Sequence, residues 1–412
     1  MTGDLLNFDP GNVKSEAEDK ILQALESIRN AGEAQKPDMG WVGLPFEIKY
    51  IKMVQNWKKT VSKKQLTLCV LGIGGSSLGA KAVYDFLMPD SKVLFFDNID
   101  GDWFQKRLKS IDFEDCHFLA ISKSGETCET LFQLEHVCQE LKAKKLAFGN
   151  HITVITEDKS SRLKSFCEEF SLRFLPVPND VGGRFSVFSN VGLAPLVWAG
   201  VPARKLFEGA LWASKQKKLV AQIASFYLKS LSREEWINVL WMYVENLRTF
   251  GLWFEQLWAE SLGKSLDHSG KPAPRVSTPM TCIGATDQHS LLQQFTEGPK
   301  DKSFLFIRSH GSETSKEIKK PISQALEFTK NHSVGKLLAI EAQGTQKNLD
   351  DLNLHTALLT INKNDVYTIG ALIYLFELVV ATLGEILEIN VYNQPGVEAV
   401  KKFTLSALGG SR

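Results

Sequence analysis

The chain has 412 residues, a length that predicts about two to three domains and allows a large buried core. Apolar residues make up 43% and charged residues 23%, which excludes a disordered, collagen-like or coiled-coil chain. The formal net charge is +1, so no global field attracts nucleic acid or an anionic membrane. The start, MTGDLLNFDPG, lacks the basic and apolar regions of a secretory signal, and we expect a cytoplasmic protein.

Residues 1–44 are predicted to form a helical N-terminal extension. Ser15 and Glu18 have the spacing of a capping box, and apolar residues between Ile21 and Ile28 recur at helical spacing. Nothing in this extension indicates a functional site.

From Gln65 onward, short apolar runs alternate with amphipathic helical stretches, which predicts parallel strands joined by crossover helices. The predicted strands of this series are residues 66–71, 92–96, 116–121, 151–155 and 172–177. A helical pattern then runs from about residue 193 to residue 262. Further strands are predicted at residues 280–284, 303–307 and 355–361.

The predicted fold class is α/β, with two domains that each contain a mainly parallel sheet flanked by helices. We expect the first domain at residues 45–203 and the second at residues 204–388, because the first strand series ends before Pro202. A C-terminal helical segment is expected at residues 389–412.

Six cysteines are scattered through the chain without a C-x-x-C pair, which predicts small core residues rather than a disulfide framework or a zinc module. The cysteines and histidines between Cys116 and Cys138 lack a familiar ligand spacing, so no metal site is predicted there. Residues 369–387 form a long apolar stretch, but Glu377 lies at its middle, which favours a buried helix over a membrane span.

Residues 70–80, VLGIGGSSLGA, have the pattern of a strand that runs into a glycine-rich loop and then a helix. The N–H groups of such a loop and of the helix N-terminus together form an anion site. The dinucleotide pattern G-x-G-x-x-G fails because Ser77 occupies the position of the third glycine, which disfavours a nucleotide-dependent oxidoreductase. The hydroxyls of Ser76 and Ser77 favour hydrogen bonds to a phosphate, and a tight turn without a ligand is the alternative.

Residues 121–130, ISKSGETCET, repeat this arrangement after the strand at 116–121. Ser122, Ser124 and Thr127 are short donors, and Lys123 adds a positive charge. Two such loops at the carboxyl ends of parallel strands can converge on one phosphate monoester. The alternative is a helix N-cap, which Thr127 alone can provide.

Six segments in this order resemble the signatures of the glucose-6-phosphate isomerase family in its shorter bacterial type: GIGGSSLG, SKSGETCET, GGRFSVFSNVGL, AESLGK, DQHSLLQ and NQPGVEAVKK. The resemblance implies two sugar-isomerase α/β domains, a sugar phosphate substrate, and a reaction without cofactor or metal. It also implies a homodimer whose active site is shared between chains, and in which Glu260 and His289 of one site come from different chains. The substrate contacts that it implies are Gly75, Ser76, Ser122, Lys123, Ser124, Thr127, Gln256 and Gln394.

Interconverting an aldose and a ketose phosphate requires ring opening and transfer of a proton between carbon 1 and carbon 2 through an enediolate, which one base can perform. The resemblance implies that Glu260 is this base. It follows Phe254, Leu257 and Trp258 in a helical stretch, surroundings in which a carboxylate takes up a proton more readily than in water. Gln256 lies one turn earlier on the same face. A surface or capping glutamate is the alternative interpretation.

Arg184 follows two glycines, whose bare backbone brings a permanent cation close to a ligand. The resemblance implies that it stabilises the enediolate, and an ordinary salt bridge is the alternative.

Thr286 is expected to cap a helix over residues 289–295, where the positive end of the helix dipole favours a neutral His289. The resemblance implies that His289 opens the sugar ring, and a surface histidine is the alternative.

Lys401 lies seven residues after Gln394, and the resemblance implies that it assists the histidine at the ring oxygen. Helical phase alone does not distinguish it from Lys402. We expect the helix that carries it to turn Val397 and Val400 toward the core.

Two positions depart from the family pattern. Leu262 replaces a frequent asparagine, so a hydrogen bond in that turn is expected to be missing, and Glu126 places a carboxylate inside the second loop, where it should point outward. A non-catalytic sugar-phosphate-binding regulator of the same fold is the main alternative function. It is disfavoured because all four implied catalytic residues are present, namely Arg184, Glu260, His289 and Lys401. Whether mannose 6-phosphate is also a substrate stays open.

Overall fold

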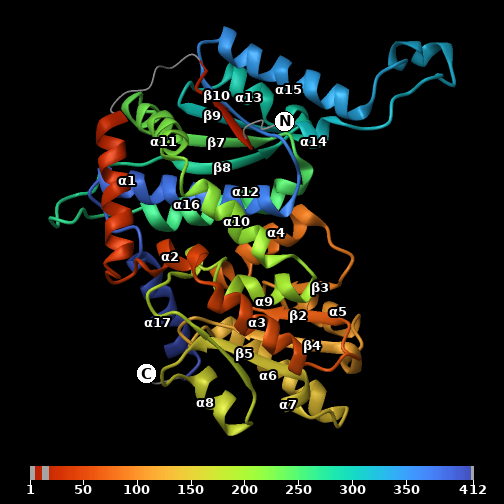
Figure 1. The fold of residues 1–412 in the computed structure, drawn as a ribbon, viewed down its shortest axis with the longest axis vertical. Helices are drawn as coiled ribbons and strands as arrows, with labels where there is room; N and C mark the ends of the chain where they lie inside the picture. Colours follow the sequence, from red (N-terminus) through yellow and green to blue (C-terminus); the bar gives the residue numbers. More distant parts are fainter. Residues whose placement is uncertain (1–4, 12–17, 410–412) are drawn as a thin grey trace. The chain divides into compact units, whose positions relative to one another are not determined.

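The computed structural model describes residues 5–11 and 18–409, so Ser15 of the predicted capping box lies outside the described residues. The chain forms two compact units, each built around one β-sheet (Figure 1). Unit 1 comprises the N-terminal segment up to Ser27 and Gly209–Asn390, and unit 2 comprises Ile28–Glu208 and the C-terminal segment from Val391. The domain boundaries expected at residues 44, 203 and 388 stay predictions.

Unit 2 contains a five-stranded parallel sheet in the order β3-β2-β4-β5-β6. Every residue of β2 and β4 is buried, as expected for parallel strands that are covered on both faces. Because β2 and β4 are neighbours, the loops that follow them leave the same edge of the sheet. The strands are β2 (Thr67–Leu71), β3 (Val93–Phe96), β4 (Cys116–Ile121), β5 (Ile152–Glu157) and β6 (Arg173–Val177).

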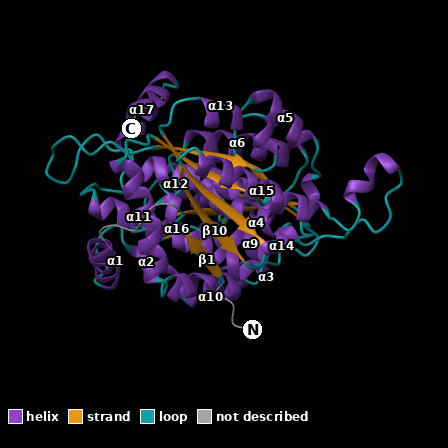
Figure 2. Cartoon of the chain, turned by 90° about the horizontal axis from the view of Figure 1, so that it is seen from above, coloured by secondary structure: helices purple, strands orange, loops and turns teal. Residues whose placement is uncertain are grey.

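Helices cover both faces of this sheet. Figure 2 shows that helices surround the strands of the chain. Cys69 and Leu71 of β2 face a core formed with α5, α6 and α8, and the opposite face packs against α3 and α9. On that opposite face, the Trp57 indole of α3 donates to Thr153 Oγ1 of β5 at 2.9 Å. The helices from residue 18 to residue 213 and the C-terminal helix are α1 (Glu18–Glu33), α2 (Gly40–Gly43), α3 (Ile48–Thr60), α4 (Leu78–Leu87), α5 (Gly101–Lys109), α6 (Cys128–Ala143), α7 (Phe148–His151), α8 (Arg162–Glu169), α9 (Asn190–Trp198), α10 (Ala203–Ala213) and α17 (Glu398–Ala407).

Unit 1 contains the second five-stranded sheet, in the order β1-β10-β9-β7-β8, in which only β1 is antiparallel to its neighbour. The fold class predicted from the sequence, α/β with two mainly parallel sheets flanked by helices, is therefore confirmed. The strands are β1 (Leu6–Asp9), β7 (Ile237–Met242), β8 (Thr278–Ile283), β9 (Lys302–Ser309) and β10 (His355–Ile361).

Two of these strands differ from the sequence prediction. The span from residue 193 to residue 262 was expected to be helical, but β7 lies within it and pairs with β8 and β9. The run INVLWM is apolar on both faces, and such a run has the same periodicity as a buried helix. The N-terminal extension is helical in α1, yet β1 is a strand that buries Leu6 and Phe8 and covers the edge of β10.

The sheet of unit 1 is also covered on both faces. Trp241 of β7 and Phe306 of β9 face a core completed by α13 and α15, while the other face packs against α12, which in turn packs on α16. The apolar stretch predicted to be a buried helix forms α16, and 89% of its most apolar window is buried inside the structure although its length and composition would suit a membrane span. The remaining helices are α11 (Lys217–Ser232), α12 (Arg248–Leu262), α13 (Leu292–Glu297), α14 (His310–Glu313), α15 (Val334–Asp351) and α16 (Val366–Ile386).

Candidate active site

The first predicted phosphate loop lies between β2 and α4. Residues Gly74–Ser76 form a 3-10 turn in which Gly74 adopts a φ of +57°, a conformation that suits glycine. Ser77 holds the N-cap position of α4, but its buried hydroxyl bonds to the Gly74 carbonyl at 3.4 Å and does not cap the helix. Of the two hydroxyls expected to meet a phosphate, only that of Ser76 is on a partly exposed residue.

A close backbone contact places Arg184 beside this loop. A Cβ atom on Gly75 would lie 2.4 Å from the Gly183 carbonyl carbon and 2.8 Å from the Arg184 nitrogen, so only glycine fits at residue 75 without a shift of the backbone. The Ser186 hydroxyl bonds to the carbonyls of Gly183 at 2.6 Å and Gly75 at 3.3 Å, which ties the two segments together.

The second predicted loop lies between β4 and α6. The hydroxyls of Ser122 and Thr127 are hydrogen-bonded to each other at 2.8 Å, and the Gly125 N–H donates to Ser122 Oγ at 3.1 Å. Thr127 is at the N-cap position of α6, but its side chain does not cap the helix. The N-cap alternative therefore does not account for this threonine.

Lys123 is held by a residue that the sequence analysis missed. Its ammonium lies 3.6 Å from Glu157 Oε1, and its carbonyl accepts from the Glu157 N–H at 3.1 Å. Glu157 ends β5, the neighbour of β4, and that adjacency is the signal that points to it. Ser124 is exposed. The carboxylate of Glu126 accepts from the Arg162 N–H at 2.8 Å and forms an ion pair with the Arg162 guanidinium, so it is bound to the first residue of α8.

Arg184 is buried and contacts the C-terminal segment of the same unit. Its Nη1 donates to Gln394 Oε1 at 3.1 Å, and its Nη2 donates to the carbonyls of Val391 and Asn393. The structure thus brings together two of the predicted site residues that lie 210 positions apart in the chain.

Lys401 lies on α17, where its ammonium bonds to Glu398 Oε1 at 2.8 Å, and its side chain is 54% exposed. The expectation that Val397 and Val400 face the core is wrong, because they are 40% and 68% exposed. This short helix buries none of its residues in the structure, so helical spacing of apolar residues did not indicate a core face here.

In unit 1, Glu260 lies in the last turn of α12 and accepts from Gln256 Nε2 at 3.0 Å, as their one-turn spacing predicts. The helix runs antiparallel to the strands, because Gly251 near its start packs against Met242 at the carboxyl end of β7. Near its end, the Trp258 indole donates to the carbonyl of Ser277, which precedes β8, at 2.8 Å. Glu260 therefore lies near the amino ends of the strands. Leu262, the departure noted beside it, is buried.

His289 lies beyond the opposite end of β8, and the helix expected over residues 289–295 is wrong. Residues Thr286–His289 form a 3-10 turn, and α13 starts only at Leu292. Asp287 Oδ2 accepts from the Ile283 N–H at 2.6 Å and Gln288 donates to the Tyr243 hydroxyl at 3.0 Å, contacts that hold this turn against the sheet and leave His289 exposed.

Glu260 and His289 consequently lie at opposite ends of one sheet. The strand between them, β8, has six residues, which at roughly 3.3 Å per residue gives a length of about 20 Å. Within one chain, the two side chains do not meet on a single small substrate.

No group of three or more His, Cys, Asp or Glu side chains among residues 5–11 and 18–409 is arranged to hold a metal ion. Five of the six cysteines are buried, Cys128 is partly exposed, and all six are free.

The family model of phosphoglucose isomerase matches residues 48–408. The chain belongs to this family. A glucose-6-phosphate isomerase from Carboxydothermus hydrogenoformans is 32% identical over 95% of this chain and 89% of its own length. The solved structure of a hypothetical protein from Thermus thermophilus superposes with a TM-score of 0.89 at 29% identity, over 98% of this chain and all of its own. A glucose-6-phosphate isomerase from Chlamydia trachomatis, with a TM-score of 0.82 at 19% identity over 99% of this chain and 89% of its own, shares the fold.

Proposed function

We propose that this chain is an enzyme that interconverts glucose 6-phosphate and fructose 6-phosphate by ring opening and proton transfer through an enediolate. Its family membership supports this assignment, as does the name of its relative from Carboxydothermus hydrogenoformans, a glucose-6-phosphate isomerase. The observation that carries it lies within unit 2, where two hydroxyl- and glycine-rich loops leave one edge of the sheet and the helices that follow them have no side-chain cap.

The loops of unit 2 bind the phosphate. The backbone around Gly75 and the hydroxyl of Ser76 contact it from one loop, and Lys123 supplies a positive charge from the other. Three further hydroxyls of the second loop complete the contacts, those of Ser122, Ser124 and Thr127. The buried carboxylate of Glu157 lies 3.6 Å from the Lys123 ammonium. It keeps the lysine in place when no phosphate is bound.

The reacting carbons meet a separate set of side chains. Glu260 moves the proton between carbon 1 and carbon 2, and Gln256 orients its carboxylate through their 3.0 Å hydrogen bond. Arg184 stabilises the negative charge of the enediolate, and Gln394, its hydrogen-bond partner, binds the substrate beside it.

Ring opening is assigned to His289, which acts on the ring oxygen with the help of Lys401. The imidazole is exposed and follows a turn that Asp287 holds against β8, so it is free to reach a substrate outside its own unit. All of these steps use acid, base and charge chemistry, so the proposed reaction requires no cofactor and no metal.

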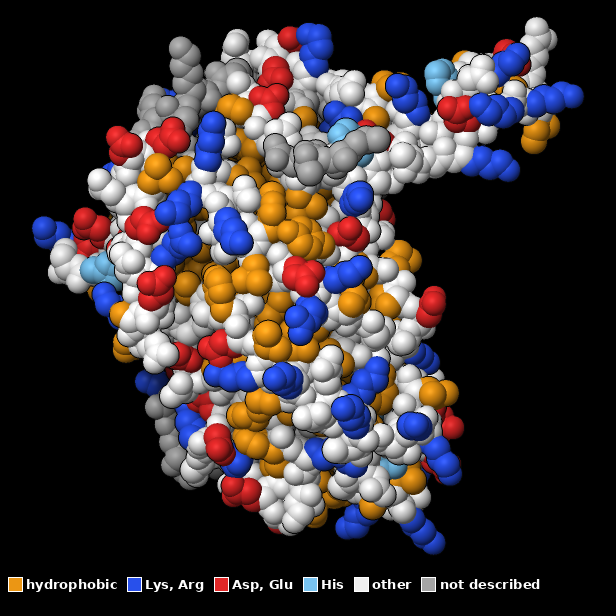
Figure 3. All heavy atoms as spheres, in the orientation of Figure 1, with side chains coloured by type: hydrophobic (Ala, Val, Ile, Leu, Met, Phe, Trp, Pro, Cys, Tyr) orange, Lys and Arg blue, Asp and Glu red, His pale blue; other side chains and the backbone are white. Residues whose placement is uncertain are grey.

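The active site is shared between two copies in a homodimer. Glu260 and His289 lie at opposite ends of β8, so one site takes its glutamate from one chain and its histidine from the other. An arm of unit 1, residues 314–333 between α14 and α15, stands away from the rest of the unit and carries hydrophobic and charged side chains (Figure 3). Ile322 and Phe328 on this arm are 101% and 78% exposed, which favours an apolar contact with another molecule.

A coupled assay tests the proposed reaction. Purified protein is incubated with fructose 6-phosphate and with mannose 6-phosphate, in the presence of a metal chelator, and glucose 6-phosphate is measured. We expect turnover of fructose 6-phosphate at a rate that the chelator does not change. We also propose that the protein is cytoplasmic. Failure to produce glucose 6-phosphate from well-folded protein would contradict the proposal, and binding without turnover would favour the regulator instead.

A further inference from the structure

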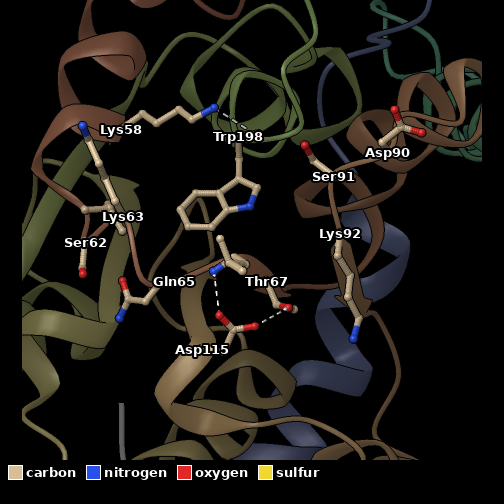
Figure 4. A pocket seen from close by; sticks show the side chains of 12 residues that line it. Lys58, Ser62, Lys63, Gln65, Thr67, Asp90, Ser91, Lys92, Asp115 and Trp198 are labelled. Atoms are coloured by element: carbon tan, nitrogen blue, oxygen red, sulfur yellow. Dashed lines mark hydrogen bonds between the residues drawn. The ribbon is translucent and has the colours of Figure 1, made fainter.

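Unit 2 contains a pocket at the end of its sheet opposite the two phosphate loops (Figure 4). Thr67 begins β2, Lys92 directly precedes β3 and Asp115 directly precedes β4, so the pocket lies at the amino ends of these strands. Its volume of about 590 Å³ falls within the range of small-molecule sites, roughly 300 to 1,000 Å³. The isomerase mechanism proposed above uses none of its lining residues.

The apolar part of the pocket is built on the indole of Trp198, which packs on a hydrogen-bonded histidine. Trp198 lies at its centre in Figure 4, and the indole stacks on the ring of His117 with centroids 5.9 Å apart and planes 18° from parallel. His117 is buried and bonded to Thr153 Oγ1 at 2.8 Å and Gln65 Oε1 at 3.2 Å. Burial lowers the pKa of His117 to about 3, so the ring is neutral at physiological pH. The indole is thus held in place before any ligand arrives, and because Trp198 is 7% exposed, only a small part of it faces the pocket.

Two lysines at the rim have no assigned role. Lys63 and Lys92 lie on either side of Trp198 (Figure 4), and the ammonium group of neither has a hydrogen-bond or ion-pair partner in the part of the chain that the structure describes. Asp90, two positions before Lys92, also lines the pocket, and its carboxylate has no partner among the residues that the structure describes. The lining holds three lysines against two aspartates, which favours an anion.

The remaining two charges of the lining are already engaged. Lys58 donates to the carbonyls of Val197 at 2.9 Å and Trp198 at 3.0 Å, so it caps the end of α9. Asp115 accepts from the Leu66 N–H at 3.1 Å and from the Thr67 hydroxyl at 3.4 Å. An incoming anion therefore meets two rim lysines and one unpaired carboxylate, that of Asp90, while Asp115 is already engaged.

We propose that this pocket binds a small organic anion with a flat ring, of the size of a nucleoside monophosphate. The ring packs against the exposed side chain of Leu66 and the small exposed part of Trp198, and the anionic group contacts Lys63 or Lys92 at the rim. The combination of a ring surface and two cations excludes a neutral ring compound and a simple inorganic anion as the preferred ligand.

The test is calorimetric titration of the full chain with AMP, adenosine, ribose 5-phosphate and inorganic phosphate. We expect AMP to bind at one site per chain, and each of the other three probes to bind at least about tenfold more weakly. A Lys63→Gln/Lys92→Gln double variant should lose AMP affinity at least about tenfold. A matched Lys36→Gln/Lys52→Gln double variant, at two exposed positions of unit 2 outside the pocket, should not.

Lys123→Ala distinguishes this pocket from the phosphate loops, because AMP held by those loops would be lost in Lys123→Ala and kept in the rim double variant. That result would overturn the proposal, as would no AMP binding at millimolar concentration or ribose 5-phosphate binding as tightly as AMP. Isomerase activity measured on the same preparations should be unchanged by the rim variants. It reports on the proposed function independently, so the two proposals fail separately.

Discussion

The two units place their functional side chains differently on similar sheets. In unit 2, the candidate residues lie in loops that directly follow β2 and β4, and such loops converge because neighbouring parallel strands end at the same edge. In unit 1, Glu260 ends a helix that runs back along the sheet, whereas His289 follows a strand. In the proposed function, unit 2 alone supplies the phosphate contacts, whereas unit 1 supplies two groups that lie at opposite ends of its sheet.

The units also differ in the polar groups that they bury. His117 of unit 2 has a hydrogen-bond partner for each ring nitrogen, while both carboxylate oxygens of Glu377 in unit 1 have no hydrogen-bond partner among the described residues. A satisfied buried group is nearly neutral for stability, whereas an unsatisfied carboxyl is costly. Unit 1 is thus expected to respond to pH at a residue that has no role in the reaction.

The largest effect should come from Glu260→Gln, which changes the proposed catalytic base of unit 1 and leaves the phosphate loops of unit 2 intact. The amide keeps the shape but cannot accept the proton, so kcat should fall by roughly a hundred- to ten-thousand-fold. The dissociation constant for fructose 6-phosphate should change little. Glu245→Gln, at an exposed carboxylate just before α12, is the matched control and should retain full turnover. Retention of more than a tenth of normal kcat by Glu260→Gln would exclude this residue as the base.

A second substitution tests the close backbone contact between Gly75 and Gly183 in unit 2. Gly75→Ala places a Cβ atom 2.4 Å from the backbone of Gly183, where no flexible side chain can give way. We expect a loss of about 1 to 3 kcal/mol in the free energy of unfolding and weaker phosphate binding. Gly101→Ala, at a site with no heavy atom within 4 Å, is the control. Equal stability and equal phosphate affinity in both variants would show that this contact does not shape the loop.

Changes in the phosphate loops should weaken substrate binding more than they lower kcat. Lys123→Ala is expected to weaken fructose 6-phosphate and inorganic phosphate by about tenfold, because it removes a charged contact to a part of the substrate that does not react. Ser76→Ala should act in the same direction. Lys159→Ala removes the other lysine that pairs with Glu157 and should leave affinity unchanged. Unchanged phosphate affinity in Lys123→Ala and Ser76→Ala would mean that these loops are only structural.

The smallest effect concerns Glu377. Burial raises its pKa well above the usual carboxyl value, so the folded chain keeps a proton that the unfolded chain releases above about pH 4.5. Stability therefore falls as pH rises from that value toward the raised pKa. Glu377→Gln removes this dependence, so the variant should gain more in Tm over the parent at pH 8 than at pH 5. The exposed Glu297→Gln is the control, and an equal Tm gain at both pH values would refute the assignment.

Much of unit 2 was predictable from the sequence, because its strands are short apolar runs, and two of them, β2 and β4, are followed directly by glycine or hydroxyl residues. The strand β7 was not, since INVLWM lies between long helical patterns and only its pairing with β8 and β9 distinguishes it from a buried helix. The contact of Gly75 with Gly183 and the bond from Arg184 to Gln394 join segments far apart in the chain, so no local pattern reports them.

The surroundings of His289 show a similar limit. Thr286 has the sequence of a helix cap, but the side chains of Asp287 and Gln288 bond to the sheet and to α15, and these long-range contacts favour a 3-10 turn. Glu157 was missed because its role depends on which strand lies beside β4. In both cases the residue type was visible, and the partner depended on tertiary structure.

The central claim, that one active site draws on two chains, is tested most directly by mixing two inactive variants. Glu260→Gln and His289→Ala should each be inactive alone. Co-refolding equal amounts should yield about half heterodimers, each with one site that carries both changes and one site that carries neither.

The account predicts recovery of roughly a quarter of wild-type turnover in the mixture, when the sites work independently and the chains exchange fully. If both residues of a site came from one chain, every site would keep one defect. No recovery in a sample whose heterodimers are confirmed by mass would contradict the shared site.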